Sequence, residues 1–459
     1  MTYSQFSRPT SDSNHMNRRS VVASVIKTVY AIARNWRPAA LPALSALALL
    51  AAGCGTASSA HQAAGTPSAP SRSAPAGSSP TGAATHTSAA SGSAGSGSSS
   101  CRAGATVYTA PGSPTQVQPL QAIQFVSASQ GWAAGAGRIL ATSDGGHTWT
   151  VQYTGPAKLD QVDFTDAEHG WAVGTNSLLR TTDGGRTWTQ LSEPACPAPV
   201  ESVHFVTPDL GYAVAGAAQV WMSGGVPAAV GGGELLTTSD GGSHWTKVAA
   251  APAQAQTVGF SDPNDGFLGT PGKVWHTADG GKTWSLAFSE PPAPGVQSPA
   301  PDITVLQSAG GSAAWVLFLG YGAALGHAPY LAYATQDAKT WRPVFEESYI
   351  ESAARPGVHA PDGPGSYPGP FSAISPDAAA FVGFNPSAGY GAAPLELVTS
   401  GGTTRTSAGN VAGISAPIAA AFTSPSQGWV VGETIPSRGF VIVATTDGGH
   451  TWTRQDQVR

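Results

Sequence analysis

The chain has 459 residues, and charged residues make up only 11% of them. Residues 1–53 contain six basic residues and one acidic residue. The remainder therefore has 16 basic and 26 acidic residues (22 − 6 and 27 − 1) and a net charge of −10. This negative charge argues against a nucleic-acid partner, because phosphate binding needs a basic surface. The 57 glycines and 37 prolines indicate many turns and favour an all-β protein.

Residues 1–53 predict an export signal. A basic segment precedes an apolar run at residues 39–52, which is shorter than the ~20 residues that span a bilayer. The run ends in Leu-Ala-Ala-Gly-Cys at residues 50–54, which resembles a bacterial lipobox. The resemblance implies cleavage before Cys54 and a lipid on that cysteine, which would anchor the protein to the outer face of the cell membrane. The alternative is an ordinary signal peptide with a chance cysteine, and either Met1 or Met16 is the true start.

The next segment, residues 54–104, consists almost wholly of Ala, Ser, Gly, Thr and Pro, which predicts a disordered linker. Two more cysteines follow, Cys101 and Cys196. Outside the cytoplasm this pair can oxidise to a disulfide, and two unpaired thiols are the alternative. The spacing of these cysteines fits no metal motif.

A short motif recurs throughout residues 105–459, and its first copy is Ser-Asp-Gly-Gly-His-Thr-Trp at residues 143–149. Seven copies define seven units, which we number repeats 1 to 7 in chain order. The copy in repeat 5 is one residue short, and the copy in repeat 6, residues 400–405, has lost both the Asp and the Trp. The Asp residues of the other six copies are Asp144, Asp183, Asp240, Asp279, Asp337 and Asp447.

A second motif precedes each turn. In repeat 1, Phe125 is followed six residues later by Gly131 and Trp132, and the same spacing recurs in repeats 2, 3, 4 and 7. Each repeat has the pattern of four short strands, with the Asp-containing turn between strands three and four. In repeat 1 these strands are expected at 122–126, 132–136, 138–142 and 148–153. Repeated units of this kind predict an all-β protein, a seven-bladed β-propeller of four-stranded antiparallel blades over residues 105–459.

The turn motif resembles the Asp-box, or BNR repeat, of sialidases, sortilin-type receptors, xyloglucan hydrolases and photosystem II assembly factors. The resemblance implies a propeller with its Asp-boxes on the rim away from the ligand face. The six Asp residues above are therefore interpreted as structural, and a row of catalytic or calcium-binding carboxylates is the alternative. The resemblance implies little about function, because these families share little beyond the fold.

The long loops all fall on the opposite face, between strands two and three or between successive repeats, and they belong mainly to repeats 3, 5 and 6. Loops on a rigid scaffold often hold binding residues, although each such residue can also be a solvated loop residue. The candidates for ligand binding are Trp221, Tyr321, His327, Tyr349, Glu351, Arg355, Tyr390 and Arg438, with Met222, His359, Tyr367, Glu346, Glu347 and Asp362 beside them.

An enzyme is the weaker interpretation. A sialidase needs three arginines at one site, and only Arg138, Arg355 and Arg438 could reach the loop face, where their surroundings match no sialidase motif. A xyloglucanase needs two carboxylates across a cleft, and the available ones lie in one loop. A metal site at His327, His359 and Glu351 has no recognisable spacing.

We therefore expect a monomeric, non-catalytic binding protein with no catalytic residue, cofactor or metal. Its partner is expected to be a protein or a glycan, and its only membrane contact is expected to be the lipid on Cys54. The alternative is a cell-surface glycoside hydrolase with an atypical site.

Overall fold

The computed structural model describes residues 101–102, 106–109, 119–174, 177–191, 199–216, 218–221, 227–230, 232–292, 303–320, 327–347, 357–386, 391–434 and 439–455. The predicted signal, Cys54 and most of the linker lie outside these residues. Regular structure in the described part is β throughout, apart from one 3-10 turn, η2 (Ser400–Gly402). Nowhere in that part is a helix long and apolar enough to cross a membrane. The all-β prediction is confirmed.

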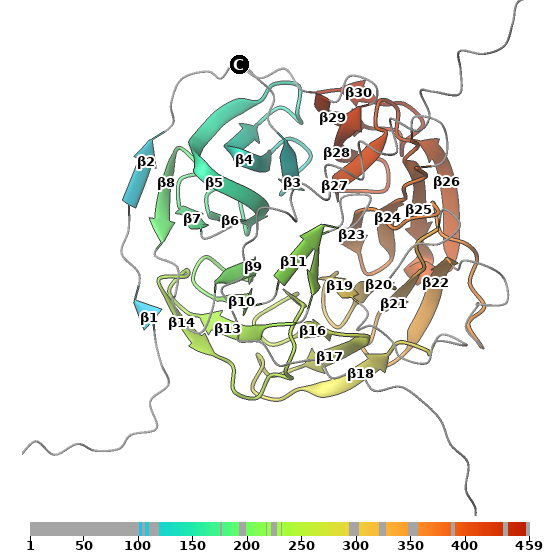
Figure 1. Ribbon diagram of the computed structural model, residues 1–459, viewed down its shortest axis with the longest axis horizontal. Helices are drawn as coiled ribbons and strands as arrows, with labels where there is room; N and C mark the ends of the chain where they lie inside the picture. The colour runs from blue at the N-terminus through green and yellow to red at the C-terminus, as the bar shows by residue number, and fades with distance from the viewer. Residues whose placement is uncertain are drawn as a thin grey trace, which may run out of the picture. The chain divides into compact units, whose positions relative to one another are not determined.

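The sheets are arranged radially around one axis, with the first strand of each repeat nearest the axis and the fourth strand outermost (Figure 1). The first sheet contains β2 (Thr106–Thr109), β3 (Leu120–Phe125), β4 (Gly131–Thr142), β5 (Thr150–Phe164), β6 (Gly170–Gly174), β7 (Ser177–Thr181) and β8 (Thr187–Leu191). The sheet of repeat 3 contains β1 (Cys101–Arg102), β9 (Val200–Phe205), β10 (Gly211–Ala215), β13 (Glu234–Thr238) and β14 (His244–Lys247). A separate hairpin contains β11 (Ala218–Trp221) and β12 (Pro227–Val230).

The remaining four sheets each contain the four strands of one repeat. They are β15 (Thr257–Phe260), β16 (Gly266–Thr270), β17 (Lys273–Thr277) and β18 (Ser285–Ser289) in repeat 4, and β19 (Ile303–Ser308), β20 (Ala314–Leu319), β21 (Tyr330–Thr335) and β22 (Trp341–Glu347) in repeat 5. Repeat 6 contributes β23 (Phe371–Ser375), β24 (Ala378–Val382), β25 (Pro394–Thr399) and β26 (Thr404–Asn410), and repeat 7 contributes β27 (Ala416–Phe422), β28 (Gly428–Thr434), β29 (Gly439–Thr445) and β30 (Thr453–Arg454).

The prediction of seven separate four-stranded blades is wrong. Counted as hydrogen-bonded sheets of four or more strands, the described residues form six blades, and the first blade contains both repeat 1 and repeat 2. The reason lies in the link between these repeats. Lys158 still pairs with Ala136 of β4, so β5 continues without a break until Val162 pairs with Ala172 of β6. The sequence pattern identifies the two repeats, but it does not show that the link between them remains hydrogen-bonded to the neighbouring strands.

The turn between the third and fourth strands is held by its aspartate, and we call it the Asp turn. In repeat 1, Oδ1 of Asp144 accepts hydrogen bonds from the Thr142 hydroxyl (2.8 Å) and the Thr148 backbone N–H (2.9 Å), and Oδ2 accepts one from the Thr148 hydroxyl (2.7 Å). Gly145 and Gly146 have φ of 76° and 92°, which favours glycine. A threonine two residues before the Asp, present in all six repeats that have the Asp, is a further part of the motif.

In six of the seven repeats, the turn between strands three and four contacts the loop between the first two strands of the same repeat. In repeat 1 the N–H of Gly145 donates to the carbonyl of Ser129, and the same bond is present in repeats 2, 3, 4, 6 and 7. The Asp turns and these short loops therefore share one face, the Asp-turn face. The loops between strands two and three and the links between repeats are on the other face, the loop face.

Stacked aromatic side chains join neighbouring repeats. Trp171 of repeat 2 stacks on Phe205 of repeat 3 at 3.4 Å between ring centroids, and Phe205 meets Trp245 edge to face at 5.9 Å. The Nε1 of Trp171 also donates to the carbonyl of Gly241, in the next Asp turn, at 3.0 Å. The spacing between the Phe and the Gly-Trp pair thus serves packing between repeats.

The same contacts close the ring between the last and first repeats. Trp429 of repeat 7 stacks on Phe125 of repeat 1 at 3.5 Å and donates to the carbonyl of Gly145 at 2.8 Å. Gln427 adds a hydrogen bond to the carbonyl of Ala128 at 2.9 Å. Closure therefore depends on side chains and needs no strand exchanged between the two ends of the domain.

Polar side chains join the innermost strands. In repeats 1 to 3 the residue before the first-strand Phe bonds the backbone of the corresponding Phe in the next repeat, as Gln124 does with Phe164 and as His204 does with Phe260. Asp163 accepts the N–H of Phe205 at 2.6 Å and is 8% exposed. Burial raises the pKa of Asp163, although the positive charge of His204 and the bond from Phe205 oppose the shift.

Asp163→Asn is expected to gain stability relative to the wild type as the pH rises. Because the pKa of Asp163 is raised in the folded state, its contribution is fully present below the unfolded pKa, near 3.8, and is lost as the pH rises through the folded pKa. An asparagine still accepts the N–H of Phe205 but does not titrate. Urea unfolding of both proteins at pH 4 and pH 7 measures the effect, and an equal difference at the two pH values would contradict it.

Two short strands that precede repeat 1 lie on the outer edges of other repeats (Figure 1). β1 pairs with β14 of repeat 3, and β2 pairs with β8 of repeat 2, both antiparallel. Cys101 lies in β1, whereas Cys196 lies outside the described residues, so the disulfide stays a prediction.

Candidate functional site

The loop face has its best-defined polar cluster at the junction of repeats 5 and 6, and we call this cluster the 5–6 site. It comprises His327, Tyr330, Glu347, Asp362 and Glu396. They come from the loop before β21, from β21, from the end of β22, from the link 357–370 and from β25. Strands of two repeats and the link between them therefore meet at one place.

His327 and Glu347 form the polar centre of the 5–6 site. Nδ1 of His327 lies 2.5 Å from Oε1 of Glu347. The Glu347 side chain is 8% exposed and the His327 side chain is 39% exposed, so the carboxylate is buried while its imidazole partner is accessible to solvent. Burial raises the pKa of Glu347, and the negative charge of Asp362 acts in the same direction, while His327 and the N–H of Gly363 oppose it.

A glycine- and proline-rich segment, residues 361–366, crosses over Tyr330. The Tyr330 hydroxyl donates to the carbonyl of Gly365 at 2.8 Å, and the N–H of Ala328 donates to the carbonyl of Ser366 at 2.8 Å. A Cβ on Gly363 would lie 1.8 Å from the Tyr330 oxygen, so only glycine allows the chain to pass this closely. Burial raises the pKa of Tyr330 well above its ordinary value.

Glu396 brings a third carboxylate to the 5–6 site. Burial raises the pKa of Glu396, and Arg405 on the neighbouring strand opposes the shift. Glu347, Glu396 and Asp362 also raise the pKa of the Tyr330 hydroxyl through their negative charge. The site therefore has negative potential and attracts a cationic group.

Gly363→Ala is expected to detach the segment 361–366 while the propeller stays folded. The added methyl group cannot fit against the Tyr330 hydroxyl, so the bonds from Tyr330 to Gly365 and from Glu346 N–H to the carbonyl of Pro361 should be lost. Limited proteolysis should show faster cleavage in this link, with a urea midpoint close to the wild type. His359→Ala is the control, because His359 is an exposed residue of the same link. Equal cleavage of the two variants would contradict the prediction.

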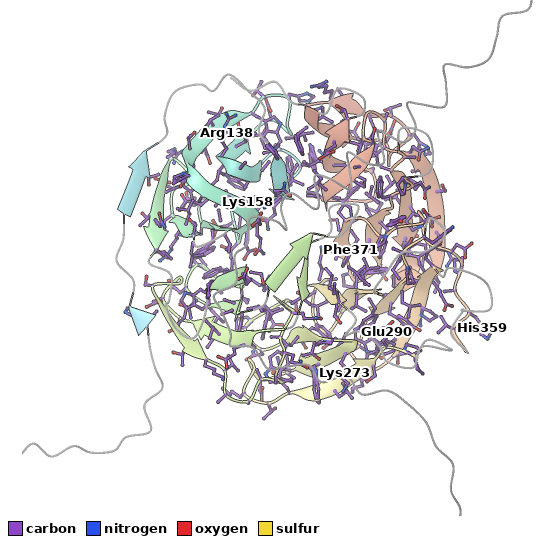
Figure 2. All side chains as sticks on the ribbon, viewed as in Figure 1. Arg138, Lys158, Lys273, Glu290, His359 and Phe371 are labelled. Atoms are coloured by element: carbon purple, nitrogen blue, oxygen red, sulfur yellow. The ribbon has the colours of Figure 1, made fainter. Side chains whose placement is uncertain are left out.

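The structure brings three of the residues named from the sequence together, His327, Glu347 and Asp362, and Glu346 contributes its backbone N–H to the carbonyl of Pro361. Tyr367 lies nearby and packs edge to face on Phe384 at 6.0 Å. His359 is exposed on the outer side of the ring (Figure 2). Trp221 lies in β11, and only its backbone is described. The other candidates lie outside the described residues: Met222, Tyr321, Tyr349, Glu351, Arg355, Tyr390 and Arg438.

Sequence reasoning missed Tyr330 and Glu396, because both lie within strands and the search was confined to loops. One signal was present. Glu396 is the only charged residue in the apolar strand Pro-Leu-Glu-Leu-Val-Thr, and a charge in such a strand indicates a polar partner or a functional site.

The described residues contain no group of three or more His, Cys, Asp or Glu side chains that could hold a metal ion. A Ser, an Asp and a His do meet at the junction of repeats 4 and 5, but the aspartate is in the middle. Asp265 accepts from Ser312 at 2.6 Å and lies 3.1 Å from His276. A nucleophile needs its base beside it, so this arrangement is not a hydrolase triad.

No protein-family model matches the chain, and no curated protein is similar to it. Solved structures with a similar fold include YCF48 bound to a D1 peptide, which is 16% identical with a TM-score of 0.45 and covers 74% of this chain and 96% of its own. A GH74 xyloglucanase from Xanthomonas campestris is 14% identical with a TM-score of 0.46, and the match covers 77% of this chain and 56% of that enzyme. The GH74 enzyme of Niastella koreensis is 12% identical with a TM-score of 0.46, over 73% and 66% of the two chains.

The strand order thus defines this chain as an all-β propeller. The similar structures include a peptide-bound protein and glycoside hydrolases, and at these identities and TM-scores they assign neither a family nor a reaction.

Proposed function

We propose that this chain is a non-catalytic binding propeller that holds a partner protein on its loop face. The observation that supports this most is the contrast between the two faces. The described Asp turns are short and their carboxylates are engaged, as in repeat 1, whereas the loop face has the long insertions and the 5–6 site. Binding residues concentrate where loops vary on a rigid scaffold.

The charge of the 5–6 site favours a basic segment of the partner. The negative charge of its three carboxylates acts on Tyr330, and Asp362 and His327 are its most accessible members. A lysine or arginine side chain could replace or join His327 beside Glu347 and form charge-assisted hydrogen bonds. The overall negative charge after residue 53 acts in the same direction and would speed association with a basic partner.

The proposal includes the tether. Lipidation at Cys54 would hold the propeller outside the cytoplasm, on a linker that lets it reach partners at a distance from the membrane. Kinship with the Asp-box repeats belongs to the same proposal, supported by the shared Asp-Gly-Gly turn sequence.

A pull-down tests the proposed function. Full-length protein purified in detergent is immobilised and incubated with membrane extract of the source cells. We expect wild type to recover a defined protein, and Glu347→Gln to recover at least tenfold less. Glu234→Gln is the matched control, since Glu234 also lies on the loop face but pairs with Lys247, away from the 5–6 site. Recovery of no protein, or equal recovery by both variants and wild type, would contradict the proposal.

A glycoside hydrolase is the second candidate, and one observation favours it. Burial raises the pKa of both Glu347 and Glu396, and a carboxylic acid with a raised pKa is what a glycosidase uses as its proton donor. Fluorogenic sialosides and β-glucan fragments would reveal turnover. Activity that Glu347→Gln or Asp362→Asn abolishes would establish the enzyme and overturn the binding proposal, whereas no turnover by wild type would exclude these substrates.

A further inference from the structure

Three junctions between repeats follow one pattern on the Asp-turn face, and the junction of repeats 1 and 2 departs from it. At three junctions the second-strand aromatic donates directly to a glycine carbonyl in the next Asp turn. The pairs are Trp171 with Gly241 (3.0 Å), Tyr212 with Gly280 (3.2 Å) and Trp429 with Gly145 (2.8 Å). At the junction of repeats 1 and 2, a side chain stands between the two partners.

That side chain is Gln152. Its Oε1 accepts from Nε1 of Trp132 at 3.2 Å, and its Nε2 donates to the carbonyl of Gly184 at 2.8 Å. The corresponding position in repeat 2 is Leu191, which is 6% exposed and packs against the next Asp turn at Gly242. Gln152 therefore separates repeats 1 and 2, whereas Leu191 lets repeats 2 and 3 pack directly against each other.

The separation leaves a cavity of about 410 Å³ on the Asp-turn face between repeats 1 and 2. This volume lies within the range of small-molecule sites, roughly 300–1,000 Å³. The cavity is lined mainly by hydroxyl, amide and charged side chains, and Trp132 beneath it is 1% exposed and offers no open ring face.

The groups around this cavity suit an uncharged ligand rich in hydroxyl groups. Glu168 and Arg186 on its rim offset each other in charge, and the carboxylate of the third charged residue, Asp183, is engaged by Thr181 and Thr187. Arg186 uses one N–H for the carbonyl of Asp183. Within the described residues, neither the Glu168 carboxylate nor the Ser143 and Thr150 hydroxyls have a protein partner. Carboxylate and guanidinium groups can each bond two neighbouring hydroxyls, which matches the vicinal hydroxyls of a sugar.

Other ligand classes fit less well. An anion would find few free backbone donors, because the N–H of Gly184 donates to the carbonyl of Glu168 and that of Gly185 donates to Thr181. A cation would find the Asp183 carboxylate already engaged by Thr181 and Thr187. An apolar ligand would leave the polar lining unpaired.

We infer that this cavity, the junction 1–2 site, binds a neutral saccharide unit, such as the end of a glycan chain. The site is on the face opposite the 5–6 site, so it would give the protein a second ligand in addition to its proposed partner. Gln152 stands at this junction and bonds both Trp132 and the carbonyl of Gly184.

Saturation-transfer NMR tests the inference with full-length protein in detergent and three probes: the methyl β-glycosides of glucose, galactose and N-acetylglucosamine. We expect transfer to at least one probe with wild type and none with Gln152→Leu, which copies the closed junction at Leu191. Glu168→Gln should raise the Kd at least tenfold without touching the core, because Glu168 is exposed. Asp209→Asn is the matched control, at the same position of the loop in repeat 3, and should keep the wild-type Kd.

Two results would overturn the inference. One is the absence of transfer to all three probes with wild type, and the other is transfer that Gln152→Leu and Glu168→Gln leave unchanged. Neither result would affect the pull-down at the 5–6 site, so the two proposals fail separately.

Discussion

Trp429→Ala is expected to lower the free energy of unfolding by about 3–5 kcal/mol, the usual cost of removing a buried tryptophan. Trp429 is 1% exposed, stacks on Phe125 and donates to Gly145, so its loss removes the main contacts that close the ring. Urea unfolding followed by tryptophan fluorescence and circular dichroism measures the change. A loss below about 1 kcal/mol would mean that other contacts close the ring.

The matched control is Trp171→Ala. Trp171 is 0% exposed and makes the same two kinds of contact, but it joins repeats 2 and 3, which are consecutive in the chain. Both variants should lose similar global stability. Only Trp429→Ala should show rapid proteolysis within repeat 7 under native conditions, because no covalent link holds that junction when its side-chain contacts fail. Identical cleavage patterns for the two variants would contradict this account of ring closure.

Acidification from pH 4 to pH 2 is expected to unfold the propeller. In the Asp turn of repeat 4, bonds from the Thr283 hydroxyl, the Thr283 N–H and the Thr277 hydroxyl lower the pKa of Asp279 to about 2. Hydrogen bonds likewise lower the pKa of Asp337 and Asp447 to about 2. A lowered folded-state pKa gives stability that is present above the unfolded value, near 3.8, and is lost as the pH falls through about 2.

The slope of unfolding free energy against pH measures this loss, because it equals the difference in bound protons between the unfolded and folded states. Asp447→Asn should reduce the slope between pH 4 and pH 2 by up to one proton. Repeating the titration in 0.5 M salt separates these local bonds from general charge repulsion, which salt screens. A slope unchanged by Asp447→Asn would contradict the assignment. Asp163, Glu347 and Glu396 have raised pKa values and act in the opposite direction.

Much of the fold could be predicted from the sequence because its contacts are local and repeated. The Asp, the glycines and the Trp of each turn recur at fixed spacing, and so does the Phe that packs on the preceding repeat. What the pattern could not show is hydrogen bonding across a link, such as the pairing of Lys158 with Ala136 that joins repeats 1 and 2 in one sheet.

The candidate site was only partly predictable for a related reason. Loop position pointed to His327, Glu347 and Asp362, because insertions are visible in one sequence. Tyr330 and Glu396 lie in strands of different repeats, and their proximity depends on how the repeats pack around the axis. The spacing of residues along the chain does not predict that packing.

Repeats 4 and 5, whose sequence motifs are weaker, are joined by a different set of contacts. Phe267 stands where repeats 1, 2, 3, 5 and 7 have a Trp or Tyr, so it cannot donate to the next repeat. A polar bridge occupies this junction instead, from His276 through Asp265 to Ser312. Ser261 adds a bond to the carbonyl of Gly311 at 2.6 Å. Loss of the aromatic donor therefore coincides with a different set of contacts between the same two repeats.

The strands β1 and β2 have a mechanical consequence. The chain reaches repeat 1 only after it has paired along the outer edges of repeat 3 and then repeat 2. A pulling force applied on the N-terminal side of Cys101 would load the two residues of β1 first and the four residues of β2 next. These short ladders would separate before the ring opens. The released strands would lengthen the N-terminal linker by several residues before the contacts at Trp429 came under tension.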